Sequence, residues 1–333
     1  MTDLGRVGVL AFAVSLAATP AVTVALAARN KLDHPNARSS HDRPVPRGGG
    51  LATIAATLVG TLSVGVPGRP ISALLAAGFL LGLLGAVEDF WGVKATYRLG
   101  MQLCVGAITG VVLSQADNAV ARPLQVLIVA GLVAANCNAV NFMDGINGIT
   151  SAKSIAAGVF FAVYGSMEHL VALQVGGVAL AGAFLAFLPF NFPSAKVFLG
   201  DSGSYFVGGW IAALAGAGFV AGLNPIVLAA PFGLYLADTL TTVIQRLRRH
   251  EPIMDPHRSH AYQRVVQAGW SHTRTTALVF GLIALHGALA LAVATSSGWL
   301  QVLAGAVIVG TLTLYLRLPQ LVAARSSVEE ISA

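Results

Sequence analysis

The stretch ISALLAAGFLLGLLGAVEDFWGV, residues 71–93, decides the fold class of this chain. It carries no charged residue before Glu88 and Asp89. An apolar run of roughly 20 residues is long enough to cross about 30 Å of hydrocarbon as a helix. The run also lacks the alternating pattern of a membrane β-barrel strand. The stretch therefore predicts a transmembrane helix that ends in two adjacent carboxylates.

The whole chain has the same character. Of its 333 residues, 56% are hydrophobic and only 10% are charged, whereas soluble domains carry roughly 25% charged residues. This composition predicts an all-α fold, a polytopic membrane helix bundle that forms a single domain over residues 1–333. About eleven transmembrane helices are expected, at residues 5–28, 49–66, 71–88, 99–115, 122–140, 148–165, 171–189, 204–222, 226–245, 276–296 and 299–317.

Several other classes of protein are disfavoured. The run at 5–28 is too long for the apolar core of a signal peptide and is interpreted as the first helix. Cys104 and Cys137 both fall inside predicted spans, which excludes a disulfide scaffold. P-loop and dinucleotide-binding motifs are absent from the sequence. The net charge of +6 indicates a basic face at a membrane, and no motif points to a nucleic-acid partner.

Charge is distributed unequally between the two sets of predicted loops. The loops after odd-numbered spans are long and charged, and with Lys153 and the C-terminal tail they hold 17 of the 20 Lys and Arg residues. The positive-inside rule places these loops in the cytoplasm, with the N-terminus outside. The acidic motifs fall on the same side, so one membrane face is expected to hold the polar chemistry.

Two acidic motifs lie at predicted helix ends. Glu88 and Asp89 repel each other unless a cation or a base role compensates, although a solvated helix end is the alternative. In NAVNFMDGINGIT, residues 138–150, the polar residues Asn138, Asn141 and Asp144 recur at a spacing of three. That spacing places them on one face of a helix, and an Asn-capped turn is the alternative.

The stretch FLGDSGS, residues 198–204, has two interpretations. Gly-Asp-Ser-Gly surrounds the nucleophilic serine of chymotrypsin-like proteases, but a membrane bundle offers no protease barrel. We therefore expect Asp201 to be the functional residue and Ser202 to cap the following helix. The helix N-terminus would favour an anion, and a cap with no further role is the alternative.

Two basic loops complete the pattern. DHPNARSSHDRPVPRGGG, residues 33–50, carries Arg38 and Arg47, whose guanidinium forks suit phosphate oxygens. RLRRHEPIMDPHRSHAYQR, residues 246–264, carries His257, Arg258 and His260, which resemble a diphosphate or nucleotide clamp. A zinc site at the two histidines and a plain basic loop are the alternatives. Asp238 is predicted to be a buried acid that pairs with a loop cation or shapes the site.

Taken in order along the chain, these motifs resemble those of the polyprenyl-phosphate N-acetylhexosamine-1-phosphate transferases (glycosyltransferase family 4). The resemblance covers the chain from Asp33 to about Arg264, and NAVNFMDGINGIT and FLGDSGS are its most specific parts. The family commonly has two aspartates where this chain has Glu88 and Asp89, and Asp89 is favoured as the catalytic one. DPHRSHAYQR in place of a tight three-histidine motif resembles the branch that initiates O-antigen and other surface polysaccharides.

The resemblance implies an Mg²⁺-dependent phosphotransferase in the bacterial plasma membrane, with Mn²⁺ as a substitute metal and its active site in the cytoplasm. It would transfer N-acetylhexosamine 1-phosphate from a UDP-N-acetylhexosamine to undecaprenyl phosphate and release UMP, initiating lipopolysaccharide or other cell-wall polysaccharide synthesis. A homodimer is compatible with the resemblance. The alternatives are the phospho-N-acetylmuramoyl-pentapeptide translocase of peptidoglycan synthesis and, in another class, a membrane transporter.

The resemblance also assigns roles. Asp201 and Asp144 would bind the metal, and Asp89, Glu88 and Asp144 would be catalytic, with Asp89 as base or positioner of the lipid phosphate. The substrate-binding residues that it implies are Asn138, Asn141, His257, Arg258, His260, Arg38 and Arg47.

Overall fold

The computed structural model describes residues 3–35, 43–65, 68–114, 121–252, 257–296 and 298–332, with side chains of the last helix described to residue 324. Two short antiparallel strands, β1 (Leu32–Asp33) and β2 (Val45–Pro46), follow the first helix. The helices are α1 (Asp3–Ala28), α2 (Gly50–Leu62), α3 (Arg69–Trp91), α4 (Ala95–Leu113), α5 (Ala121–Met143), α6 (Ile149–Met167), α7 (Val171–Asn191), α8 (Gly200–Val220), α9 (Pro225–Leu228), α10 (Gly233–Arg248), α11 (Ala261–Gln267), α12 (His272–Ala292) and α13 (Trp299–Ser332).

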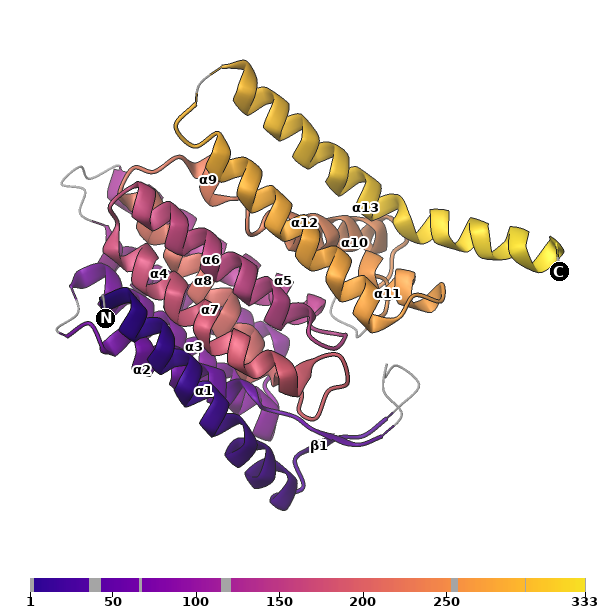
Figure 1. Cartoon of the computed structure of the whole chain (residues 1–333), viewed down its shortest axis with the longest axis horizontal. Helices are drawn as coiled ribbons and strands as arrows, with labels where there is room; N and C mark the ends of the chain where they lie inside the picture. Colours follow the sequence, from indigo (N-terminus) through magenta and orange to yellow (C-terminus); the bar gives the residue numbers. More distant parts are fainter. Residues whose placement is uncertain are drawn as a thin grey trace.

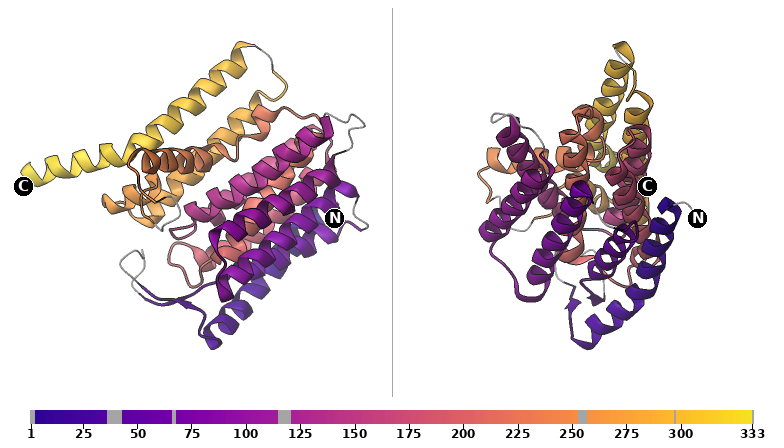
Figure 2. Two further views of the ribbon diagram at one scale, coloured as in Figure 1. Left: turned by 180° about the vertical axis from the view of Figure 1, so that it is seen from behind. Right: turned by 90° about the vertical axis from the view of Figure 1, so that its left-hand side faces the viewer.

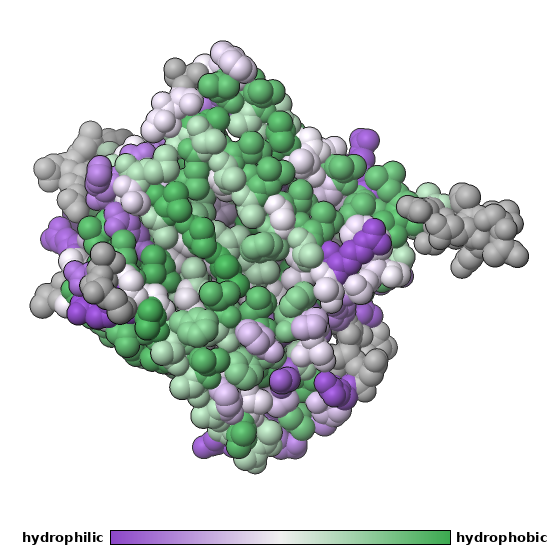
Figure 3. Space-filling model, in the orientation of Figure 1, coloured by the Kyte–Doolittle hydropathy of each residue, from purple (hydrophilic) through white to green (hydrophobic). Residues whose placement is uncertain are grey.

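Eight helices within the described ranges are long and apolar enough to cross a membrane, namely α1, α3, α4, α5, α7, α8, α12 and α13. They lie side by side as a bundle (Figure 1), which confirms the predicted polytopic helical fold. Hydrophobic residues cover much of the visible face, and hydrophilic residues gather toward its two ends (Figure 3). This distribution is that of a bundle whose middle is solvated by lipid.

Three of the eleven predicted spans need correction. The span predicted at 49–66 is the 13-residue helix α2. The span at 148–165 is α6, whose 19 residues suffice in length, but Thr150, Ser151 and Lys153 make its beginning polar. The span at 226–245 is broken into α9 and α10, and Pro231 lies in the turn between them. Proline has no backbone N–H to give to a continuous helix, so a break here is expected.

A buried lysine holds the break between α9 and α10. The Nζ atom of Lys153 on α6 donates a hydrogen bond to the Pro231 carbonyl at 2.7 Å. The same atom lies 4.4 Å from the ring centroid of Tyr235. A backbone carbonyl freed by a helix break in an apolar interior needs such a donor. Lys153 therefore belongs to the packing of the break, which explains a charge that is fully buried.

Helix α8 is the centre of the bundle. Every residue from Gly200 to Gly218 is buried, as expected of a helix that is apolar or small on all sides. The views from the back and from the side show other helices around it (Figure 2). Its largest side chain, Trp210, is fully buried and donates its indole N–H to the Gly176 carbonyl of α7 at 3.0 Å.

Glycines let two helices approach the start of α8 very closely. A Cβ atom built on Gly85 of α3 would lie 2.1 Å from the Asp201 carbonyl oxygen. One built on Gly50 of α2 would lie 2.3 Å from the backbone of Gly203. Neither helix could take this position with a larger residue there. The contacts therefore fix α2 and α3 against the first turn of α8, where the polar residues gather.

Candidate active site

Asp89 caps helix α8 from a neighbouring helix. Its Oδ1 atom accepts the backbone N–H of Asp201 and its Oδ2 atom accepts that of Ser202, both at 2.9 Å. The first N–H groups of a helix lack partners within it and carry a partial positive charge. The anion at this helix N-terminus is thus a side chain of the protein, held one turn beyond Gly85 on α3.

The prediction that Ser202 caps α8 is wrong. The N-cap residue is Leu199, and α8 has no side-chain cap of its own. Ser202 lies inside the first turn, and its hydroxyl is buried without a hydrogen-bond partner among the described residues. The carboxylate of Asp89 has taken the place of the cap, which sequence spacing could not show.

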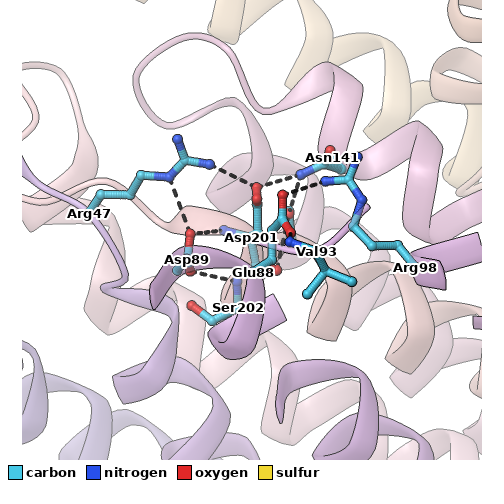
Figure 4. Close-up of polar contacts among 9 residues, drawn as sticks. Arg47, Glu88, Asp89, Val93, Arg98, Asn141, Asp201 and Ser202 are labelled. Atoms are coloured by element: carbon cyan, nitrogen blue, oxygen red, sulfur yellow. Dashed lines mark hydrogen bonds and ion pairs between the residues drawn. The ribbon is translucent and has the colours of Figure 1, made fainter. Parts of the chain in front are cut away.

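Arg47 joins the two aspartates of the site (Figure 4). Its guanidinium lies 3.2 Å from Asp89 Oδ1 and 3.0 Å from Asp201 Oδ1. The Asp89 side chain is only 3% exposed and that of Asp201 12% exposed, whereas Arg47 is 43% exposed. Two buried carboxylates this close would repel each other without a cation. Arg47 supplies that charge, and the charge of Asp201 raises the pKa of Arg47.

Asn141 lies on the other side of Asp201. Its Nδ2 atom donates to Asp201 Oδ1 at 2.7 Å and to the Ser204 hydroxyl at 3.0 Å. Both side-chain hydrogen bonds accepted by Asp201 therefore end on Oδ1, in the part of the chain that the structure describes. The second carboxylate oxygen, Oδ2, is left as an acceptor for a ligand or a cation.

Glu88 and Asp89 point to different partners (Figure 4). Glu88 Oε1 lies 2.7 Å from Arg98 Nη1 of α4. Its other oxygen accepts the backbone N–H of Val93 at 2.5 Å, just beyond the end of α3. Glu88 thus closes the corner between α3 and α4, while Asp89 faces Asp201 and Arg47. Asp89 therefore contacts Arg47 and the start of α8, and its preference over Glu88 as the catalytic residue stays a prediction.

The residues of the 138–150 motif separate. Asn138 donates to Gln102 Oε1 of α4 at 2.6 Å and so lies away from Asp201, one turn deeper in the bundle than Asn141. Asp144 follows the end of α5 at Met143, so the three do not share one helical face as predicted. Burial raises the pKa of Asp144 to about 7, and the nearby charges of Asp201 and Asp89 act in the same direction. Asp144 therefore lies within electrostatic range of the aspartate pair.

The histidine loop forms a second cluster around Asp238 of α10. His260 Nδ1 lies 3.1 Å from Asp238 Oδ1, and the His257 and His260 ring centroids are 5.1 Å apart. Asp238 is fully buried, as predicted, and its partner in the loop is the imidazole of His260. Burial, followed by the neighbouring His260 and Arg246, lowers the pKa of His257 to about 4, so its ring is neutral at pH 7.

The remaining predicted residues are placed in part. Arg38 lies outside the described residues. Arg258 lies between the two histidines, is half-buried, and its carbonyl accepts a hydrogen bond from Gln267 at 3.2 Å. Arg98, which pairs with Glu88, and Tyr315, whose hydroxyl donates to Asp238, were not marked by any motif, whereas Ser204 belongs to FLGDSGS. An arginine at the start of a predicted span, ten residues after Glu88, could have signalled Arg98, since charges at a span need partners.

The donor atoms at the aspartate pair suit a hard divalent cation. Among the described residues, no group of three or more His, Cys, Asp and Glu side chains is arranged to hold a metal. Zinc sites need three or four such ligands, so the zinc alternative at His257 and His260 gains no support. Mg²⁺ keeps several waters and takes only one or two protein carboxylates. Asp201, with its uncommitted Oδ2 atom, and nearby Asp144 fit that requirement.

The chain is similar to several known proteins. A family model described as glycosyl transferase family 4 matches residues 71–218. The decaprenyl-phosphate N-acetylglucosaminephosphotransferase of Mycolicibacterium smegmatis is 28% identical, over 86% of this chain and 82% of that protein. A probable undecaprenyl-phosphate N-acetylglucosaminyl 1-phosphate transferase of Bacillus subtilis is 27% identical, over 88% of this chain and 87% of that protein. The phospho-N-acetylmuramoyl-pentapeptide-transferase of Clostridium beijerinckii is 29% identical, over 72% of this chain and 79% of that protein.

Proposed function

This chain belongs to glycosyl transferase family 4, and on that premise we propose that it transfers N-acetylhexosamine 1-phosphate from a UDP-sugar to a polyprenyl phosphate. The observation that carries the proposal is the aspartate pair, Asp89 and Asp201, bridged by Arg47 at one end of an apolar bundle. An anionic lipid headgroup and a nucleotide diphosphate can both reach such a site from the membrane surface. The lipid tail stays among the apolar helices.

The relatives favour a particular donor and acceptor. Those of M. smegmatis and B. subtilis are named for N-acetylglucosamine and for a decaprenyl or an undecaprenyl phosphate. We therefore propose UDP-N-acetylglucosamine as donor and undecaprenyl phosphate, or a similar polyprenyl phosphate, as acceptor. A role in initiating O-antigen or another surface polysaccharide stays a prediction from the histidine loop.

The proposed reaction is a phosphoryl transfer. An oxygen of the lipid phosphate attacks the phosphorus that carries the sugar, a new P–O bond forms, and the bond to the oxygen shared with the uridylate phosphorus breaks. UMP leaves with that bridging oxygen, and the lipid carries the diphosphate sugar. Such reactions depend mainly on positioning and on neutralising charge. Helices α3, α5 and α8, together with the segment before α2, bring the residues for positioning and for charge neutralisation to one point.

The contacts of each site residue indicate its role in the proposed reaction. Arg47, more exposed than either aspartate, can contact a phosphate oxygen while it stays near Asp201. Both Asp89 oxygens already accept N–H groups of α8, which supports a positioning role for Asp89 rather than a role as base. Asp201 and Asp144 would hold Mg²⁺, which when bound neutralises diphosphate charge. His257, His260 and Arg258 would contact the diphosphate sugar.

Release of UMP by the purified protein tests the proposal. The assay would supply undecaprenyl phosphate, Mg²⁺ and one of four donors: UDP-N-acetylglucosamine, UDP-N-acetylgalactosamine, UDP-N-acetylfucosamine or UDP-N-acetylmuramoyl-pentapeptide. UMP release is expected with UDP-N-acetylglucosamine and only when both lipid and Mg²⁺ are present. Release only with the pentapeptide donor would reassign the substrate. Absence of release with every donor would contradict the proposed function.

A further inference from the structure

The carboxylate of Asp238 accepts hydrogen bonds from three parts of the chain: its own helix α10, the histidine loop and α13. The Tyr315 hydroxyl of α13 donates to Oδ2 at 2.7 Å, and the backbone N–H of Ala261 donates to both oxygens at 3.0 and 3.1 Å. The Thr242 hydroxyl, one turn along α10, donates to Oδ1 at 3.3 Å. His260 Nδ1 completes the set at 3.1 Å. Asp238, His260 and Tyr315 are at most 2% exposed.

This set of donors determines the orientation and the tautomer of His260. An ionised carboxylate only accepts hydrogen bonds, so the ring nitrogen that faces Asp238 must carry a proton. The network therefore assigns the N–H to Nδ1 and leaves Nε2 as an acceptor, which suits a hydroxyl or N–H group of the sugar rather than a phosphate oxygen. Nε2 is buried and has no hydrogen-bond partner among the described residues. A buried ring nitrogen without a partner is costly unless a ligand satisfies it.

The ring of His260 is also fixed by stacking next to the Asp144 loop. Its centroid lies 6.1 Å from that of Phe142 at the end of α5 and 6.1 Å from that of Tyr262, with interplanar angles of 28° and 22°. The Tyr262 hydroxyl donates to the Phe142 carbonyl at 3.1 Å. Phe142 lies two residues before Asp144. The histidine loop is thereby attached to the segment that carries a proposed metal ligand.

We propose that Tyr315 is a positioning residue for substrate binding, which acts through Asp238 to hold His260 with Nε2 directed at the donor substrate. The proposal rests on the proposed function, in which His260 contacts the diphosphate sugar. Tyr315 lies far beyond residues 71–218, which the family model matches. Only 11% of the apolar stretch of its helix is buried, the smallest share among the eight candidate spans. Tyr315 itself is nevertheless only 2% exposed. The last helix thus contributes a residue to the site from the rim of the bundle (Figure 1).

A matched control lies one turn away on the same helix. The Thr311 hydroxyl of α13 contacts His286 Nε2 of α12 at 2.8 Å, so it also joins α13 to the bundle by a hydrogen bond. The hydrogen bonds of the Thr311 hydroxyl within the described part of the chain go to His286 and to its own helix, and none goes to Asp238 or His260. Tyr315→Phe and Thr311→Val each remove one hydroxyl from α13, but only the first reaches the histidine loop.

A double-mutant cycle tests the proposal in steady-state kinetics of UMP release. Tyr315→Phe is expected to raise KM for UDP-N-acetylglucosamine by about tenfold, since small misplacements of binding groups have large effects. KM for the polyprenyl phosphate should not change. Thr311→Val should stay within about twofold of the unaltered protein. In a His260→Ala background, Tyr315→Phe should add no more than about twofold, because the two residues act as one unit. Effects that multiply, or no effect of Tyr315→Phe, would overturn the proposal.

A second measurement does not depend on catalysis. The ¹⁵N shifts of the His260 ring, assigned by their loss in His260→Ala, report which nitrogen carries the proton at about pH 8, above the ordinary pKa of imidazole. Protonation at Nδ1 is expected in the unaltered protein and in Thr311→Val, and a mixture of tautomers in Tyr315→Phe. If no donor yields UMP, the proposed function fails and this spectrum alone decides. A Tyr315→Phe spectrum identical to that of the unaltered protein would then refute the positioning role.

Discussion

Asp89 and Asp201 show how the function of a carboxylate depends on what its oxygens already contact. Asp89 uses both oxygens to accept N–H groups at the start of α8, and Asp201 uses only Oδ1 for Arg47 and Asn141. Asp201 therefore keeps an oxygen for a cation, and Asp89 holds the turn on which Asp201 lies. The neighbouring Ser202 contributes only its backbone N–H to these contacts.

Asp201→Asn is expected to lower UMP release by at least about a hundredfold, as losses of an electrostatic contact at a reacting phosphate usually do. The amide keeps an oxygen at Oδ1 for Arg47 and Asn141, so the fold should persist. Ser202→Ala removes a hydroxyl that has no hydrogen-bond partner among the residues that the structure describes, and its activity should stay within about threefold. Initial rates, with melting temperatures as the check on folding, measure both. An inactive but folded Ser202→Ala protein would contradict the assignment.

The stability of the folded protein is expected to depend on pH through Asp144. Burial raises its folded-state pKa to about 7, whereas the unfolded carboxyl titrates near pH 4. Between these values the folded state binds more protons, so the free energy of unfolding falls as pH rises from about 4 through 7. The Asp144→Asn variant lacks the titrating carboxyl and should not lose this part of its stability as the pH rises.

Without divalent cations, the melting temperature of Asp144→Asn relative to the unaltered protein should therefore increase from about pH 5 to about pH 8. Asp3→Asn, at an exposed carboxyl of α1, is the control and should show no such trend. A difference in melting temperature that is the same at every pH would show that the pKa of Asp144 is not raised in the folded protein.

The contact between helices α3 and α8 shows how one small residue places a charged one. Gly85 lets the two backbones touch at Asp201, and Asp89 follows one turn later on the same helix. Residues four apart lie on one face of a helix. The glycine and the aspartate therefore act together, since the cap forms only if the helices are this close.

Gly85→Ala should separate α3 from α8 and abolish UMP release, with a destabilisation of about 1–3 kcal/mol from overpacking. Gly100→Ala is the matched control, because a Cβ on Gly100 of α4 meets nothing within 4 Å. Alanine favours a helix interior over glycine by roughly 0.5–1 kcal/mol, so the control should be neutral or stabilising. Thermal unfolding in detergent and the UMP assay compare the two. Equal behaviour of both variants would contradict the role of the contact.

The charged and polar residues of the candidate site lie at one end of the bundle, and the loops at the other end carry few charges. Helices α3 and α5 end where α6, α8 and α12 begin, and the aspartates, Arg47 and the histidine loop all lie at that end. The excess of Lys and Arg in the loops there predicts that this end faces the cytoplasm.

Labelling of single cysteines with a membrane-impermeant maleimide checks this orientation. In a Cys104→Ser background, Ala221→Cys, at the exposed C-cap of α8, should react in intact spheroplasts. Ser194→Cys, in the exposed loop before α8, should react only after the membrane is opened. The reverse pattern would place the site outside the cytoplasm.

Much of the site could be read from residue types and their positions along the chain. The motifs around Asp89, Asp144, Asp201 and the histidine loop were each marked by polar residues at the ends of apolar runs. Arg98, the partner of Glu88, and Tyr315, a partner of Asp238, were not marked, since they lie on other helices and follow no short spacing. The break between α9 and α10 was missed because an apolar composition persists through the turn, although Pro231 was its signal.

The sequence by itself determined that this chain is a bundle of membrane helices, and it predicted that most of the acids and histidines lie at one end. Length and hydropathy are local properties, and the thickness of the bilayer converts them directly into spans. Only the tertiary structure decided that Asp89 caps α8, that Glu88 pairs with Arg98, and that His260 and Tyr315 share Asp238 as a partner. Those choices depend on how closely helices pack and which faces meet, because a buried polar group takes the partner that packing brings to it.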